Sequence, residues 1–247
     1  MKIDLLTLFP EMCEAVLNTS IIGRAREKGL VEFSCHQIRD YTLNRQNQVD
    51  DSPYGGGEGM LMTAQPIYDC FRAVEKLRGE KLHLIYMTPT GKTLTQERVK
   101  ELSELSGFAI LCGRYEGVDQ RVIDAIVDEE ISIGDYVVTG GELPALILSD
   151  AVSRMISGVL STQEGYTEES HFNFLLEYPQ YTKPAIWNEM SVPEVLVTGH
   201  HANIEKWRRQ QSLRLTFKRR PELLENANLS LEDEKFLESL KESVGNN

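Results

Sequence analysis

The chain has 247 residues and a formal net charge of −12 at pH 7, with 41% hydrophobic and 26% charged residues. This balance is typical of globular proteins, and no apolar run approaches the roughly 20 residues of a membrane-spanning helix. Asp4 and Glu11 interrupt the N-terminal segment too early for a signal peptide, and four scattered cysteines form no C-x-x-C zinc pair, so we expect a cytoplasmic protein without a membrane segment.

The N-terminal region predicts two strands and a long loop. Residues 3–8 are mostly apolar and indicate a strand, after which Pro10 opens a short helix. Apolar and polar residues alternate over 31–35, as in a half-buried strand. The polar segment 39–60 ends in the glycine-rich run 55–59. Its composition leaves two interpretations open, a flexible linker or a loop that covers a ligand.

The middle of the chain alternates strands with helices, which predicts a parallel sheet with helices on both faces. The expected strands cover 82–87, 108–112 and 131–133, and the expected helices cover 64–77, 96–105, 118–127 and 142–158. Turns at 88–91, 113–117 and 134–141 end the three strands. Ligands in such sheets bind beyond the carboxyl ends of the strands, so these turns predict a small-molecule site.

The last of these turns contains two adjacent glycines, Gly140 and Gly141. Glycine permits a positive φ and lets the backbone approach a ligand closely, and both properties suit a binding loop. Glu142 and Pro144 follow in the first helical turn, where an acid complements the helix dipole and a missing N–H is harmless. Strand end, glycine turn and buried helix together favour a ligand site at this position.

Two apparent motifs do not hold, and a third common motif is absent. Gly91-Lys92-Thr93 would need a glycine at Tyr86 to form a P-loop, and the chain has no G-x-G-x-x-G for an ordinary dinucleotide site. The adjacent histidines at 200 and 201 point in different directions and have no third metal ligand nearby, so we predict no metal site from them.

The C-terminal third predicts a second domain. The polar segment 161–170 lacks helical or strand periodicity and marks a boundary. We therefore assign residues 1–160 to an α/β domain, 161–175 to a flexible linker and 176–247 to a small helical domain.

The C-terminal domain contains a strongly basic segment. Seven basic residues and no acidic residue fall in 206–220: Lys206, Arg208, Arg209, Arg214, Lys218, Arg219 and Arg220. They form either a solvated helix face or, in a chain this acidic, a local phosphate-binding patch.

Several of these segments together resemble one family. The segments are YGGGEGM (54–60), CGRYEGVD (112–119), IGDYVVTGGELPA (133–145), SRMISGVL (153–160), YPQYTKP (178–184), VPEVLVTGHHANIEKWR (192–208) and RRPELLEN (219–226). They are similar, in order and over nearly the whole chain, to the bacterial tRNA (guanine-N1)-methyltransferases. That family transfers a methyl group from S-adenosylmethionine to N1 of the guanine immediately 3′ of the anticodon, at position 37 of tRNA.

The resemblance implies a fold and an assembly that the spacing itself does not show. Members belong to the SPOUT class, in which the C-terminal part of the α/β domain forms a deep trefoil knot. They act as homodimers and are reported to need magnesium, for which Glu116 is a conceivable contact. The family usually has a histidine at the place of Gln46, so this chain departs from the family pattern there.

The resemblance also implies site residues. The S-adenosylmethionine pocket would comprise Tyr86, Pro89, Gly113, Tyr115, Glu116, Ile133, Gly134, Asp135, Tyr136, Val137, Val138, Gly140, Gly141 and Pro144. Arg154 would hold guanine O6, although Asp150 four residues earlier allows an ordinary helix ion pair instead. Glu169 would be the general base where the family has an aspartate, although composition alone makes Glu168 and Glu169 solvated linker residues.

Two other function classes stay open at this point. A nucleotide-dependent oxidoreductase of doubly wound fold is disfavoured by the missing phosphate fingerprint. A non-catalytic RNA-binding dimer is kept open by the aspartate-to-glutamate difference at residue 169. We expect the methyltransferase.

Overall fold

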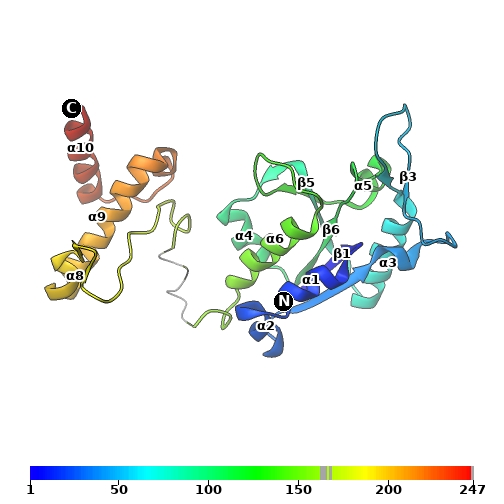
Figure 1. Ribbon diagram of the computed structural model, residues 1–247, viewed down its shortest axis with the longest axis horizontal. Helices are drawn as coiled ribbons and strands as arrows, with labels where there is room; N and C mark the ends of the chain where they lie inside the picture. Colours follow the sequence, from blue (N-terminus) through cyan, green and yellow to red (C-terminus); the bar gives the residue numbers. More distant parts are fainter. Residues whose placement is uncertain (162–165, 167–168, 246–247) are drawn as a thin grey trace. The chain divides into compact units, whose positions relative to one another are not determined.

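A five-stranded parallel sheet forms the centre of the N-terminal unit in this computed structural model, which describes residues 1–161, 166 and 169–245. The chain divides into two units, Met1–Gln163 and Glu164–Asn247 (Figure 1). The sheet order is β2-β1-β6-β5-β7, and every neighbouring pair is parallel. The strands are β1 (Lys2–Thr7), β2 (Glu32–Gln37), β5 (His83–Thr93), β6 (Gly107–Cys112) and β7 (Glu129–Ser132). The predicted parallel sheet is confirmed.

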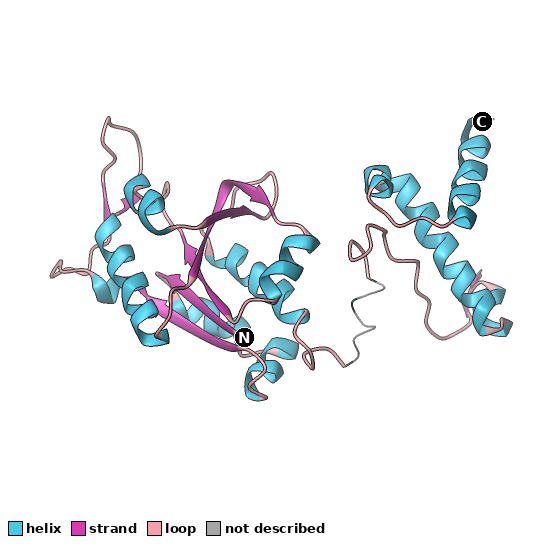
Figure 2. Cartoon of the chain, turned by 180° about the vertical axis from the view of Figure 1, so that it is seen from behind, coloured by secondary structure: helices cyan, strands magenta, loops and turns pink. Residues whose placement is uncertain are grey.

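Helices cover both faces of this sheet, as predicted (Figure 2). One face packs against α1 (Pro10–Leu17), α2 (Ser20–Glu27), α4 (Gln96–Ser103) and α6 (Glu142–Arg154), and the other against α3 (Ala64–Arg78) and α5 (Gln120–Ile126). Strand β6 shows why both faces are apolar. Its side chains alternate, with 108, 110 and 112 in the first core and 109 and 111 in the second, and all five are fully buried.

The polar segment 39–60 is more ordered than its composition predicts. It starts within the 3₁₀ helix η1 (Ile38–Tyr41), and its two-residue strand β3 (Asp50–Asp51) pairs antiparallel with β4 (Leu61–Met62). Val49 beside β3 is buried, and Thr63 donates from its backbone N–H to the Val49 carbonyl at 2.8 Å. A buried valine and one short ladder therefore fix the base of the loop.

Two element boundaries differ from the prediction. Strand β5 continues to Thr93, because it pairs with β7 both before and after the turn at 88–91. Helix α6 ends at Arg154 rather than at Gly158. After Arg154 the backbone N–H groups of Met155 and Ile156 donate to the carbonyls of Val152 and Ser153, three residues earlier, so the chain continues in tight turns instead of an α-helix. The periodicity of the side chains does not reveal this change. The short helix α2 is also absent from the prediction.

The C-terminal unit is a small helical assembly. It contains α8 (Glu194–Thr198), α9 (His201–Arg219), η2 (Pro221–Glu225), α10 (Leu231–Gly245) and a hairpin of β8 (Ile186–Trp187) and β9 (Met190–Ser191). Leu175, Leu213 and Leu237 form its buried core. Helix α10 is capped at its start: Ser230 Oγ accepts from the Asp233 N–H at 3.2 Å, and the Asp233 carboxylate accepts from the Ser230 N–H at 2.9 Å.

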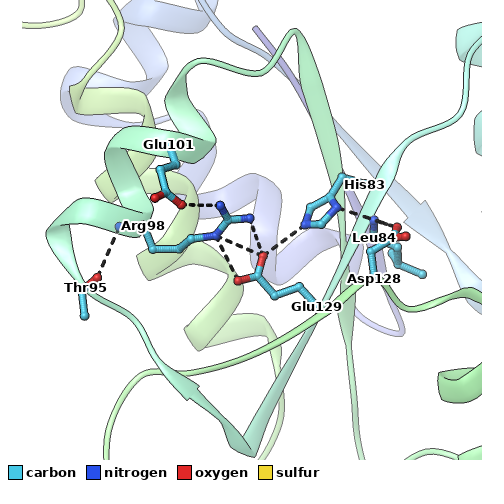
Figure 3. A network of polar contacts seen from close by, with 7 residues as sticks. All are labelled: His83, Leu84, Thr95, Arg98, Glu101, Asp128 and Glu129. Atoms are coloured by element: carbon cyan, nitrogen blue, oxygen red, sulfur yellow. Dashed lines mark hydrogen bonds and ion pairs between the residues drawn. The ribbon is translucent and has the colours of Figure 1, made fainter.

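Two polar networks hold the amino-end side of the sheet in the N-terminal unit. Glu129 at the start of β7 accepts from Arg98 Nη2 at 2.7 Å, and its carboxylate lies 3.1 Å from His83 Nε2 (Figure 3). Burial raises the pKa of Glu129, but hydrogen bonds from Arg98 and His83 outweigh burial and lower it. These contacts tie α4 to the two strands at the edge of the sheet.

The second network surrounds Asp4, a fully buried carboxylate on β1. Arg78 at the end of α3 donates to it from Nε at 2.9 Å and from Nη2 at 3.0 Å, and His36 Nε2 lies 2.7 Å away. Burial raises the pKa of Asp4, but these partners outweigh burial and hold the pKa below its ordinary value. The ionised carboxylate therefore depends on His36 and Arg78 together.

Replacing Arg78 with glutamine should destabilise the N-terminal unit by about 3–5 kcal/mol at pH 7, because it leaves a buried charge without its main partner. Denaturant unfolding measures this change in stability. The control Arg72→Gln removes a more exposed i,i+3 pair of the same helix and should cost at most about 1 kcal/mol. The pKa of Asp4 is lower in the folded state than in the unfolded state, where it is about 3.9. Its ionised carboxylate therefore stabilises the fold at pH values above about 3.9, and this stabilisation is lost as the pH falls through the folded-state pKa. The difference in stability between Arg78→Gln and the unchanged protein should shrink over the same acid range. Equal effects of the two variants would contradict this role.

Candidate functional site

The turn at 88–91 within β5 and the turns that follow β6 and β7 meet around one cavity of about 290 Å³. This volume lies near the lower end of the roughly 300–1,000 Å³ common for small-molecule sites. Twelve of the fourteen expected pocket residues line it: Tyr86, Pro89, Gly113, Tyr115, Glu116, Ile133, Tyr136, Val137, Val138, Gly140, Gly141 and Pro144. Gly134 and Asp135 lie in the same turn but not in the wall.

Apolar side chains dominate the rim of the cavity. Val137 is 80% exposed and Tyr136 is 56% exposed, although both are large apolar groups. Tyr86 at the opposite wall is buried, and burial together with the charge of Glu130 raises the pKa of its hydroxyl. Exposed apolar surface gathered around a hollow is characteristic of a ligand site. A flat aromatic ligand would find apolar contacts there and backbone groups for hydrogen bonds.

Gly140 and Gly141 do not adopt the positive φ that glycine permits. Gly141 has a φ of −77°, so it does not use the left-handed region. A Cβ at Gly141 would lie 2.8 Å from both Cys112 Cα and Gly113 N, and one at Gly140 would collide with the side chain of Arg114. The glycines are required because two loops of the protein pack closely together. Both glycines also line the cavity, so their expected close approach to a ligand stays a prediction.

A buried network behind the cavity was not found by sequence reasoning. Arg114, in the turn after β6, donates from Nε to Glu142 at 2.7 Å, and Thr7 Oγ1 at the end of β1 donates to the same carboxylate at 2.8 Å. The Arg114 guanidinium also lies 4.5 Å from the ring centre of Phe9. In the sequence, Glu142 is recognisable only as an acidic residue at the start of a helix. Its partners Thr7 and Arg114 lie 135 and 28 residues away, so local patterns do not reveal the network.

The glycine-rich loop reaches the cavity wall only at its end. Tyr54 is fully exposed, and nothing lies close to the Cβ positions of Gly55 and Gly56. Gly59, in contrast, packs against Glu116, whose backbone N–H donates to the Met60 carbonyl at 3.0 Å. Arg39 adds a second tie, because its Nη2 lies 3.3 Å from the Tyr115 hydroxyl. The exposed Gln46 lies in the outer part of this loop.

The two expected catalytic residues lie in different units. Arg154 is the last residue of α6 and is half-buried, while Asp150 on the preceding turn is exposed. Glu169, in the C-terminal unit, is half-buried and lines a hollow of about 200 Å³ together with Tyr178 and Arg208. Glu168 lies outside the described residues. The structure therefore places Glu169 in a wall of the C-terminal unit rather than on a fully solvated segment.

Much of the basic segment is neutralised by the fold. Four of its cations form ion pairs: Lys206 with Glu232, Arg208 with Glu205, Arg209 with Asp233, and Arg220 with Glu222. Arg209 holds Asp233 at 2.9 Å and also donates to the Asn228 carbonyl at 3.0 Å, so it joins α9 to α10. Arg214, Lys218 and Arg219 are exposed and enter no ion pair among the described residues. Trp207 is half-buried beside Tyr181 and is not among the residues of the buried core of this unit.

The described parts of the chain contain neither a metal-ligand cluster nor a membrane segment. Among those residues, no three His, Cys, Asp or Glu side chains gather closely enough to hold a metal ion. None of the described helices has the length and apolar character needed to cross a membrane.

Comparison with known proteins assigns the family. Residues 1–226 match the family described as tRNA (Guanine-1)-methyltransferase TrmD. A Ruminiclostridium cellulolyticum protein named tRNA (guanine-N(1)-)-methyltransferase is 57% identical over 93% of this chain and 100% of its own length. Proteins of the same name are 52% identical in Alkaliphilus oremlandii (98% of this chain, 99% of the relative) and 47% identical in Staphylococcus haemolyticus (100% of both). The chain belongs to the tRNA (guanine-N1)-methyltransferase family.

Proposed function

We propose that this protein transfers a methyl group from S-adenosylmethionine to N1 of guanine in tRNA, at the guanine immediately 3′ of the anticodon. The observation that carries this proposal is the cavity formed jointly by the three strand-end turns. Two of those turns, 113–117 and 134–141, lie in segments that resemble the family, and the family match extends over residues 1–226. Neither a nucleotide-dependent oxidoreductase nor a non-catalytic RNA-binding protein accounts for both observations.

The cavity suits S-adenosylmethionine, which supplies an electrophilic methyl group on its sulfonium when bound. Ile133, Val138 and Pro144 offer apolar contacts for the adenosine, and the glycine-containing turns expose backbone groups beside them. No residue of the wall needs to become covalently attached. The task of the wall is to hold the donor so that the substrate nitrogen can approach in line.

The substrate nitrogen carries a proton that must leave as the methyl group arrives. We assign Glu169 as the base that accepts it. A carboxylate is a weak base for this proton, so the negative charge that develops on the guanine must be stabilised elsewhere. Arg154 is assigned that second task, holding guanine O6. Arg154 is assigned because it lies in a family-like segment, and Glu169 because it stands where the family has an aspartate.

The same proposal includes a trefoil knot, a homodimer and a cytoplasmic location. The knot enters the proposal through membership of the family, whose model matches residues 1–226. Leu143 and Ile147, one turn apart on α6, are each 47% exposed and would suit a second copy of the chain. Magnesium stays a prediction. Glu116 offers one carboxylate beside the cavity, and Mg²⁺ often takes only one or two from a protein.

Filling the cavity should abolish donor binding without unfolding the protein. Val138 lies in an exposed turn and lines the cavity, so Val138→Trp should weaken S-adenosylmethionine binding at least about tenfold by steric exclusion. Val16→Trp, at a 47% exposed site on α1 outside the wall, is the matched control. Isothermal calorimetry measures both variants. Binding of NAD instead of S-adenosylmethionine by the unchanged protein would favour the oxidoreductase.

Removing the proposed base should stop methyl transfer but not binding. Glu169→Gln should lower kcat by about 10²–10⁴, the usual contribution of a positioned base, while Glu169→Asp stays active. The assay follows methyl incorporation into unmodified tRNA and maps the modified nucleotide. Glu168→Gln is the neighbouring control and should change little. An inactive unchanged protein would contradict the methyltransferase, and a fully active Glu169→Gln would contradict only the assignment of the base.

The exposed cations of α9 should supply part of the tRNA affinity. Changing Arg214, Lys218 and Arg219 together to glutamine should weaken binding and flatten its salt dependence, by roughly 0.9 in slope for each duplex phosphate that is no longer neutralised. Donor affinity should not change. The control changes Arg24, Lys28 and Lys76, three exposed cations of the N-terminal unit. Filter binding across salt concentrations distinguishes the outcomes, since equal slopes for the two triple variants would indicate an effect of net charge alone.

A further inference from the structure

Glu142 is a completely buried carboxylate that lies behind the candidate site rather than in it. It is the first residue of α6, and the cavity wall includes its neighbours Gly141 and Pro144 but not Glu142 itself. A carboxylate at a helix start gains from the helix dipole, yet that gain does not require burial. Its complete removal from water needs another explanation.

The partners of Glu142 come from two separate strands. Thr7 Oγ1, at the end of β1, donates to Oε1 at 2.8 Å, and Arg114 Nε, after β6, donates to Oε2 at 2.7 Å. Thr7 is itself fully buried and accepts from the Phe9 N–H at 2.9 Å. Each carboxylate oxygen thus has its own donor. A buried charge with such geometry is strongly destabilised when one partner is removed.

This network also determines how closely two walls of the cavity approach each other. Arg114 packs so tightly against Gly140 that no Cβ fits between them, and its Nη1 lies 3.4 Å from the Thr139 carbonyl. Beside this contact the Gly141 N–H donates to the Gly113 carbonyl at 2.8 Å. The turn after β6 and the turn before α6 are therefore joined along their length. Glu142 is the charged group that holds Arg114 in this arrangement.

We infer that Glu142 is a positioning residue for the methyl donor: held by Thr7 and Arg114, its buried carboxylate sets the spacing of two cavity walls without touching the ligand. This inference rests on the proposed function, because the donor is the ligand whose affinity reports the spacing. Loosening the network should widen the cavity and weaken donor binding. Transfer from a bound donor should change much less, because Glu142 does not line the cavity.

Two isosteric variants test this inference. Glu142→Gln keeps the shape but removes the charge that holds Arg114, and Thr7→Val removes only the hydroxyl. Each should raise the Kd for S-adenosylmethionine about tenfold to a hundredfold, the effect of removing a hydrogen bond to a charged group. Thr7→Ser restores the hydroxyl and should bind within about threefold of the unchanged protein, a small difference on this scale. Calorimetry and circular dichroism are performed on the full chain at a temperature where every variant is folded.

Kinetics separate positioning from a purely structural role. We expect the KM for S-adenosylmethionine to rise with the Kd, while kcat at saturating donor stays within about threefold. If Thr7→Val folds and binds S-adenosylmethionine with an unchanged Kd, the inference is overturned. The Thr7→Val variant therefore tests the inference even if Glu142→Gln does not fold. A fall in kcat alone would also overturn it. If the unchanged protein does not bind S-adenosylmethionine, both the inference and the proposed function fail, whereas binding unaffected by the substitutions removes the inference alone.

Discussion

The parallel direction of all five strands is the constraint on which the candidate site depends. Every neighbouring pair in the sheet is parallel, so the carboxyl ends of the strands lie at one edge. The turn within β5 and the turns after β6 and β7 are separated by helices in the sequence, yet they line one cavity. A parallel sheet also needs helices on both faces to cover its apolar side chains. Burial of the two faces therefore leaves this edge as the natural place for a ligand.

Close contact between backbones gives the cavity its shape. Gly91 approaches the backbone at Glu130 and Ile131, where a Cβ would come within 2.5 Å. Gly141 makes a similar approach to Cys112 and Gly113. These glycines join protein to protein, in contrast to the glycines of phosphate-binding loops, which face the ligand. The walls are consequently held by packing and hydrogen bonds before any ligand is present, and such preorganisation lowers the cost of binding.

The charged residues are distributed unevenly along the chain, so the net charge does not describe each part of it. The chain is acidic, with a net charge of −12, yet helix α9 carries the basic segment. Tertiary contacts neutralise part of that segment, and Arg209 is used to join α9 to α10 through Asp233. The cations left exposed, Arg214, Lys218 and Arg219, lie towards the C-terminal end of α9. The density of basic residues in the sequence overstates the number available for a phosphate backbone, because some of them stabilise the C-terminal unit.

The sequence by itself determined the parallel sheet, its covering helices, the three strand-end turns and the family. These follow from local periodicity and from short motifs, which depend on residues near one another in the chain. It also located twelve of the cavity's residues, because motif and wall coincide. The sequence did not predict that α6 ends at Arg154, because apolar side chains continue at helical spacing through the turns that follow the helix.

Only the tertiary structure decided why particular residues are required. Glu142 resembles an ordinary helix-start acid until Thr7 and Arg114 are brought to it from distant segments. From the sequence, Gly141 resembles a residue that is required for a positive φ. In the structure its φ is −77°, and the backbone of Gly113 lies too close to leave room for a Cβ. Asp4 resembles a surface break in a strand until Arg78 and His36 enclose it. In each case the deciding partner is remote in sequence, and burial makes the interaction strong.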